Sequence, residues 1–158
     1  MRVIFQAQML RYKIKWAFQR MRRGFSDCDV WAIDVWFLKV IPKMLRQLKD
    51  TTHSAPAFHE GPHIYAGTEE NDDNFQQWQN ILSQMLDLLK EMNTETNSYT
   101  NPYAEEWMQY IDGDLYADVP EDLRKKFVEH EIIRHNKVID AKNEFFKMFS
   151  QYFYDLWD

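Results

Sequence analysis

The chain has 158 residues, a net charge of −6 at pH 7, and only 4 Gly and 5 Pro. This length can form one domain with its own core, and so few turn-forming residues argue against a sandwich or barrel with many turns. The single cysteine excludes an internal disulfide and suits a reducing compartment. No apolar run approaches the roughly 18 residues of a membrane span, so we expect no membrane partner.

Charge is divided unevenly along the chain. Residues 1–50 contain 11 Lys and Arg against 4 Asp and Glu, and the first 26 residues contain no acid. The rest of the chain is strongly acidic. Basic helices packed beside acidic ones would explain this division. The alternatives are a basic face for nucleic acid and an acidic face that imitates nucleic acid.

Apolar residues three and four apart predict a first helix over about residues 3–23. One stripe consists of Ile4, Ala7, Leu10, Ile14, Ala17, Phe18 and Met21. A second stripe consists of Phe5, Tyr12 and Trp16, so we expect the helix to be buried on two sides or to meet a partner. Its candidate partner-binding or nucleic-acid-binding residues are Arg11, Lys13, Lys15, Arg20, Arg22 and Arg23.

A tight turn follows this helix. Gly24 can take the left-handed conformation that closes a helix, and Ser26 is a good N-cap for the next one. Asp29 completes a near capping box, and Phe25 and Val30 hold the positions of a hydrophobic staple. We therefore predict a helix–turn–helix hairpin with a structural motif made of Gly24, Phe25, Ser26, Asp27, Asp29, Trp31 and Asp34.

The remaining elements follow from periodicity and breakers. We expect a helix from about residue 27 to 49 that is kinked by Pro42, and a final helix from Pro120 that breaks near His135. Between them the sequence predicts a long loop over 50–73, a helix over 74–92, a polar linker over 93–101 and a short helix over 102–111.

Little of the sequence predicts catalysis. His130 and His135 are five residues apart, so their rings diverge on a helix and do not form a zinc motif. His59 and His63 beside Glu60 in the loop could hold a metal, which leaves a metal-dependent hydrolase as one alternative. We predict no catalytic residue, no metal and no cofactor, and we expect a protein that is not an enzyme.

One stretch resembles a pattern in small proteins of tailed bacteriophages and prophages of Gram-positive bacteria. It comprises Arg23-Gly24-Phe25-Ser26-Asp27, then Asp29-Val30-Trp31 and Asp34. The ending Tyr152-Phe153-Tyr154-Asp155-Leu156-Trp157-Asp158 resembles the same group. The resemblance covers about residues 10–92 and 143–158. It implies a viral origin and the cytoplasm of a bacterial host cell, and it carries no catalytic residue.

Together these observations predict an all-α protein, a single-domain irregular bundle of about five helices over residues 1–158. We expect a phage-encoded, non-enzymatic protein that binds a host or viral protein. One candidate target is a host defence or transcription complex that is inhibited by the acidic surface. Nucleic-acid binding by the basic first helix is the second class of function. Self-association through the aromatic C-terminus is a further option.

Overall fold

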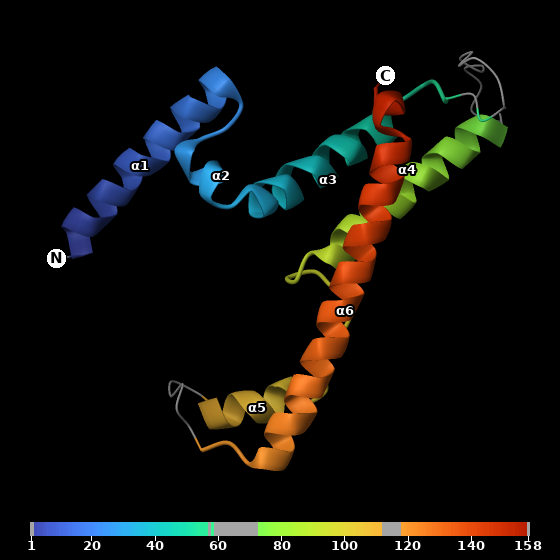
Figure 1. The fold of residues 1–158 in the computed structure, drawn as a ribbon. Helices are drawn as coiled ribbons and strands as arrows, with labels where there is room; N and C mark the ends of the chain where they lie inside the picture. Colours follow the sequence, from blue (N-terminus) through green and yellow to red (C-terminus); the bar gives the residue numbers. More distant parts are fainter. Residues whose placement is uncertain (1, 57, 59–72, 112–117, 158) are drawn as a thin grey trace. The chain divides into compact units, whose positions relative to one another are not determined.

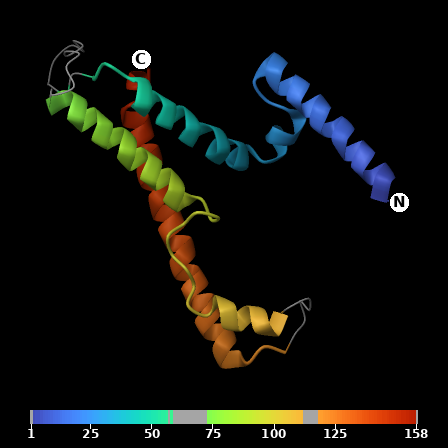
Figure 2. The ribbon, with the colours of Figure 1, turned by 180° about the vertical axis from the view of Figure 1, so that it is seen from behind.

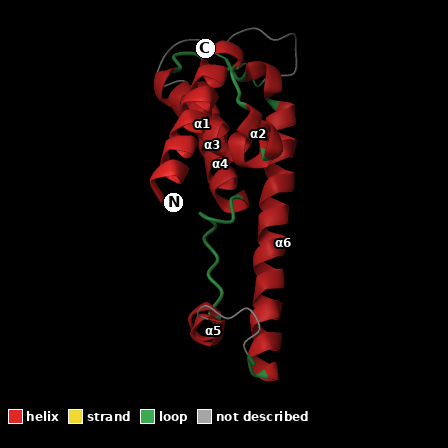
Figure 3. Cartoon of the chain, turned by 90° about the vertical axis from the view of Figure 1, so that its left-hand side faces the viewer, coloured by secondary structure: helices red, strands yellow, loops and turns green. Residues whose placement is uncertain are grey.

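The computed structural model describes residues 2–56, 58, 73–111 and 118–157, with side chains from residue 9 onward. Within these residues the chain forms six α-helices and no strand, so the predicted all-α class is confirmed (Figure 3). The chain divides into two compact units, residues 1–43 and residues 44–158. We describe each unit separately.

The first unit contains α1 (Arg2–Arg23), α2 (Asp27–Trp31) and the beginning of α3 (Ile33–Thr51) (Figure 1). The helix predicted over 27–49 is therefore two helices. They are separated at Ala32, whose φ of −143° and ψ of 68° are not helical. β-branched and aromatic side chains surround this position and lower the local helix propensity. Pro42 lies inside α3, ten residues beyond the break.

The second unit is built on two long helices, α4 (Asp73–Met92) and α6 (Glu121–Gln151), which pack against each other (Figures 1 and 2). The periodic stripe predicted for the helix over 74–92 is confirmed as its core face. The buried apolar residues of these two helices are Trp78, Ile81, Leu82, Met85, Leu89, Leu123, Ala141 and Phe145. Because α6 runs without interruption through His135, the predicted break there is wrong.

The predicted polar linker braces the first third of α6. Asn101 is buried, and its Nδ2 donates to the carbonyl oxygen of Phe127 at 3.0 Å and to Oε1 of Glu131 at 2.9 Å. The Tyr99 hydroxyl lies 2.5 Å from Nδ1 of His130. These contacts hold the linker on α6 over residues 127–131, just before the position of the predicted break.

Aromatic side chains make contacts near both ends of α6. The short helix α5 (Ala104–Ile111) stacks Trp107 on Phe127 of α6, with ring centroids 4.3 Å apart. At the opposite end of α6, the 3₁₀ turn η1 (Phe153–Asp155) follows Tyr152. The ring of Tyr152 makes a T-shaped contact with the ring of Trp78, with the ring centroids 5.9 Å apart. The C-terminal ending thus helps to close the core.

Candidate interaction surface

The turn between α1 and α2 is built as the sequence predicts. Gly24 has φ of 80°, the left-handed region, and its N–H donates to the carbonyl oxygen of Arg20 at 2.9 Å. Ser26 is fully buried, and both its N–H and its hydroxyl donate to Oδ2 of Asp29, at 2.7 and 2.8 Å. The capping box is confirmed.

An ion pair joins α1 to the first turn of α2. The guanidinium of Arg20 donates twice to the Asp29 carboxylate, at 2.9 and 2.6 Å. Bidentate pairs of this kind hold two groups in one relative orientation. The hydrogen bond from Arg20 is the main reason that the pKa of Asp29 lies well below its usual range, and the bonds from Ser26 act in the same direction.

A second set of contacts surrounds Asp27. Nε2 of Gln19 donates to its carboxylate at 2.7 Å, and the Asp27 N–H donates back to Oε1 of Gln19 at 3.0 Å. Lys15 lies 3.1 Å from the same carboxylate, and Arg23 also pairs with it. The bond from Gln19, followed by those from Arg23 and Lys15, lowers the pKa of Asp27. We call the contacts of Asp27 and Asp29 with α1 the ion clamp.

The ion clamp divides the predicted basic residues into two sets. Lys15, Arg20 and Arg23 are engaged with Asp27 and Asp29. The second set is exposed, and within the described part of the chain its members form no ion pair: Arg11, Lys13 and Arg22. Lys15, Arg20 and Arg23 therefore stabilise the hairpin, and they contribute little positive charge that is free to meet a partner.

One apolar face of α1 is open to solvent. Its members are Leu10, Ile14, Phe18 and Met21, with 59%, 62%, 59% and 82% of their surface exposed. We call them the α1 stripe. The expectation of burial on two sides fails for these residues, and the alternative expectation, contact with a partner, remains open. Elsewhere on α1 the rings of Tyr12 and Trp16 stack on each other at 5.9 Å.

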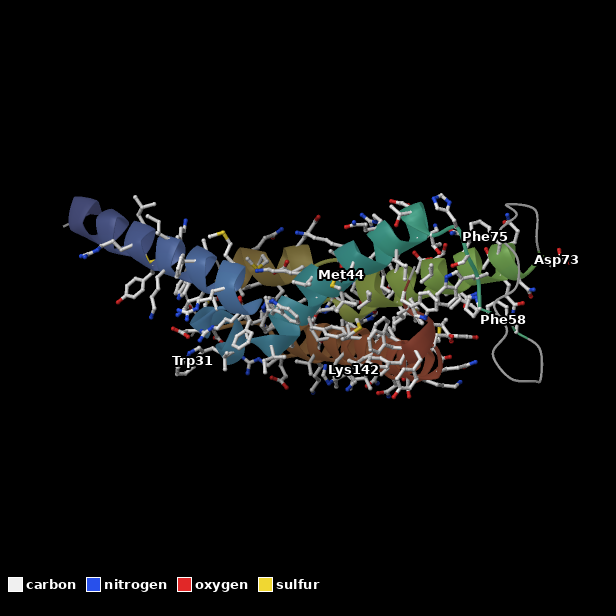
Figure 4. The ribbon with its side chains drawn as sticks, turned by 90° about the horizontal axis from the view of Figure 1, so that it is seen from above. Trp31, Met44, Phe58, Asp73, Phe75 and Lys142 are labelled. Carbon is white, nitrogen blue, oxygen red and sulfur yellow. The ribbon has the colours of Figure 1, made fainter. Side chains whose placement is uncertain are left out.

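A second apolar surface lies at the turn itself. An open hollow of about 330 Å³ is lined by Phe25, Asp29, Val30, Ile33 and Trp36. We call it the turn hollow. The Trp31 side chain beside it is 91% exposed and extends away from α2 (Figure 4).

Sequence reasoning missed the turn hollow. The single helix predicted over 27–49 would place Val30 and Ile33, three residues apart, on its core face, but both side chains are mostly exposed. The prediction assumed one continuous helix, in which residues three apart lie on the same face. The helix breaks at Ala32, so Val30 and Ile33 do not follow that spacing. The cluster of β-branched residues around Ala32 was the available signal.

The other candidate residues are placed as follows. Asp34 and Cys28 are exposed, whereas His59, Glu60 and His63 lie outside the described residues. Among residues that are described, no group of three or more His, Cys, Asp or Glu side chains could hold a metal ion.

His130 and His135 have different neighbours, as their spacing predicts. His130 meets Tyr99 and Tyr103, and His135 lies in a shallow groove with Val128 and Ile132. Glu131 pairs with Arg134 and not with His135. Burial raises the pKa of Glu131, but the hydrogen bond from Asn101 and the pairing with Arg134 outweigh burial, so its pKa is lowered.

No family model, curated protein or solved structure matches this chain. In the described residues, no helix combines the length and the apolar character that crossing a bilayer requires. The functional argument therefore depends on the geometry of the turn and of α1.

Proposed function

We propose that this protein acts by binding a partner protein, with the turn hollow and Trp31 as the contact surface. The observation that supports this function best is an almost fully exposed tryptophan beside an open apolar hollow. Aromatic anchors and the pockets beside them supply most of the binding energy in protein interfaces. Exposed apolar patches of this kind mark interaction sites.

The ion clamp makes this surface suitable for binding. Asp29 lines the turn hollow and is also held by Arg20 and Ser26. Asp27, two residues earlier, is held by Gln19 and Lys15. A surface that is already ordered loses less conformational entropy when a partner docks.

Protein binding is better supported than nucleic-acid binding. Three of the six candidate cations on α1 are neutralised by Asp27 and Asp29 within the hairpin. The lining of the turn hollow is almost entirely apolar, and its one acid, Asp29, is paired with Arg20, so the hollow offers no free positive charge to a phosphate. The loop with His59 and His63 lies outside the described residues and supports no hydrolase proposal.

The resemblance to phage proteins favours a particular class of partner. It supports a host or viral protein in the bacterial cytoplasm, and a host defence or transcription complex is the candidate that we propose to test first. In this proposal Trp31 would be the anchor of the complex, and the acidic surface of residues 44–158 would contribute to the choice of partner.

Affinity capture from a bacterial lysate treated with nuclease tests the proposal. We expect the tagged protein to retain one discrete protein, and the exposed-residue variants Trp31→Ala and Ile33→Asp to lose it. Ile132→Asp is the matched control, because Ile132 is also an exposed isoleucine but lies on α6. Recovery of nucleic acid alone from an untreated lysate with no protein retained after nuclease, or equal capture by all four proteins, would contradict the proposed function.

A further inference from the structure

We propose that α1 docks on an anionic lipid surface, with the α1 stripe against the acyl chains and Arg11, Lys13 and Arg22 at the headgroups. This inference goes beyond the proposed protein partner and depends on different residues. It concerns a helix that lies on a membrane, which does not need the length or apolar character of a spanning helix.

The arrangement of side chains around α1 supports a flat, layered partner. At about 100° per residue, the α1 stripe covers one side of the helix over roughly 17 Å. Arg11 and Arg22 then lie on one flank of the stripe and Lys13 on the opposite flank. Helices that bind in the interfacial plane share this pattern of an apolar face bordered by Lys and Arg.

The α1 stripe is also clear of the neighbouring helix. Lys15, Gln19, Arg20 and Arg23 contact the first turn of α2, and by helical geometry each lies roughly 105° to 175° around α1 from the centre of the stripe. The ion clamp therefore places α2 on the far side. A surface that meets the stripe would not collide with α2.

Charge distinguishes a lipid surface from other partners. A second copy that paired its own α1 stripe would bring cations against cations, since the first 26 residues contain no acid. Nucleic acid would place phosphates against Leu10, Ile14 and Phe18, which are apolar and exposed. A protein groove would need carboxylates on both of its rims. An anionic bilayer offers negative charge to both flanks at once, with an apolar layer beneath.

Vesicle co-sedimentation of the full chain tests this inference. The probe is a phosphatidylcholine vesicle with a minority of phosphatidylglycerol, compared with pure phosphatidylcholine. We expect binding to the anionic vesicle alone, about a fivefold loss for each of Arg11→Gln and Lys13→Gln, and at least a tenfold loss for Ile14→Asp with Phe18→Asp. Lys142→Gln and Ile132→Asp are the matched controls on α6 and should bind as the unaltered chain does.

A dye on each side of α1 keeps the test valid if an Asp variant fails to fold. In a Cys28→Ser background, an environment-sensitive dye is attached at Phe18→Cys or at Tyr12→Cys, which are similarly exposed sites on different faces. We expect a blue shift with anionic vesicles for the dye at position 18 and none for the dye at position 12. Equal shifts at both positions, or none at either, would overturn the inference.

The outcomes separate this inference from the proposed function. Binding to neutral and anionic vesicles alike, or full binding by the Ile14→Asp, Phe18→Asp double variant, would overturn lipid docking. Binding to DNA that depends on Arg11 and Lys13 but not on Ile14, with no vesicle binding, would assign α1 to nucleic acid instead. Trp31→Ala should bind vesicles normally, so loss of its protein partner is a separate result.

Discussion

At the scale of single residues, the most informative group is the Asp29 carboxylate. It accepts hydrogen bonds from Ser26 and Arg20, and these bonds close α1 against α2. Its side chain is only 11% exposed. The motif that is most conspicuous in the sequence therefore shapes the turn, and the binding surface that we propose consists of the apolar residues around it.

Asp29→Asn should loosen the hairpin by about 1 kcal/mol, because a neutral amide weakens the cap and the pair with Arg20. The expected result is faster amide hydrogen exchange at residues 26–31. Asp34→Asn is the control, since Asp34 is an exposed carboxylate in the next helix. Equal exchange in both variants would show that the ion clamp does not stabilise the turn.

Acid should open the same hairpin. The pKa values of Asp27 and Asp29 are lowered in the folded chain, so the unfolded chain binds more protons and stability rises with pH. The stabilisation is complete above the unfolded pKa of about 3.9 and is lost as pH falls below that value. Hydrogen exchange in α2 measured across this range should accelerate at low pH. The double variant Asp27→Asn, Asp29→Asn should show little change; a dependence as steep as that of the unaltered chain would contradict the assignment.

At the scale of elements, the extents of the long helices α1 and α4 were predicted well and the interruptions were not. The helix over 74–92 appears as α4 because its apolar spacing coincides with its buried face. The break at Ala32 was missed because the apolar spacing of Val30 and Ile33 continues across it. The break expected near His135 is absent, and the buried side chain of Asn101 holds the linker on the neighbouring part of α6 through Phe127 and Glu131. Such tertiary contacts leave no local pattern in the sequence.

Asn101→Ala should destabilise residues 44–158 by about 1–3 kcal/mol, because it leaves the Phe127 carbonyl and the Glu131 carboxylate without this donor. Urea unfolding followed by near-ultraviolet circular dichroism would report the change through the stacked Trp107. Asn136→Ala, at an exposed site on α6, should have almost no effect. Similar losses in the two variants would mean that the linker does not brace α6.

At the scale of the whole molecule, the two units differ in how their apolar residues are used. In residues 44–158 the large side chains Trp78 and Phe145 are fully or almost fully buried between α4 and α6. In residues 1–43 the large side chains Phe18 and Trp31 are exposed. Residues 44–158 thus enclose a packed core, whereas residues 1–43 leave large apolar side chains exposed to solvent. The sequence shows that charge is divided along the chain, but we predicted a single domain, and charge could not show which apolar residues stay exposed, because that depends on where each helix begins and ends.

Phe145→Ala should therefore cost about 3–5 kcal/mol, because it leaves a cavity between α4 and α6. The neighbouring variant Phe146→Ala is the matched control, since Phe146 is half-exposed on the same helix. Its loss should stay near 1 kcal/mol. Thermal unfolding of both variants would measure the difference, and comparable losses would contradict the proposed core.

The measurement that tests the central claim most directly is photo-crosslinking from position 31, beside the turn hollow. A photoreactive phenylalanine analogue replaces Trp31 in one sample and Lys142 of α6 in another, two exposed positions shown in Figure 4. In nuclease-treated bacterial lysate we predict one discrete protein adduct from position 31 and none from position 142. No adduct from position 31, or the same adducts from both positions, would contradict a partner-binding role for the turn.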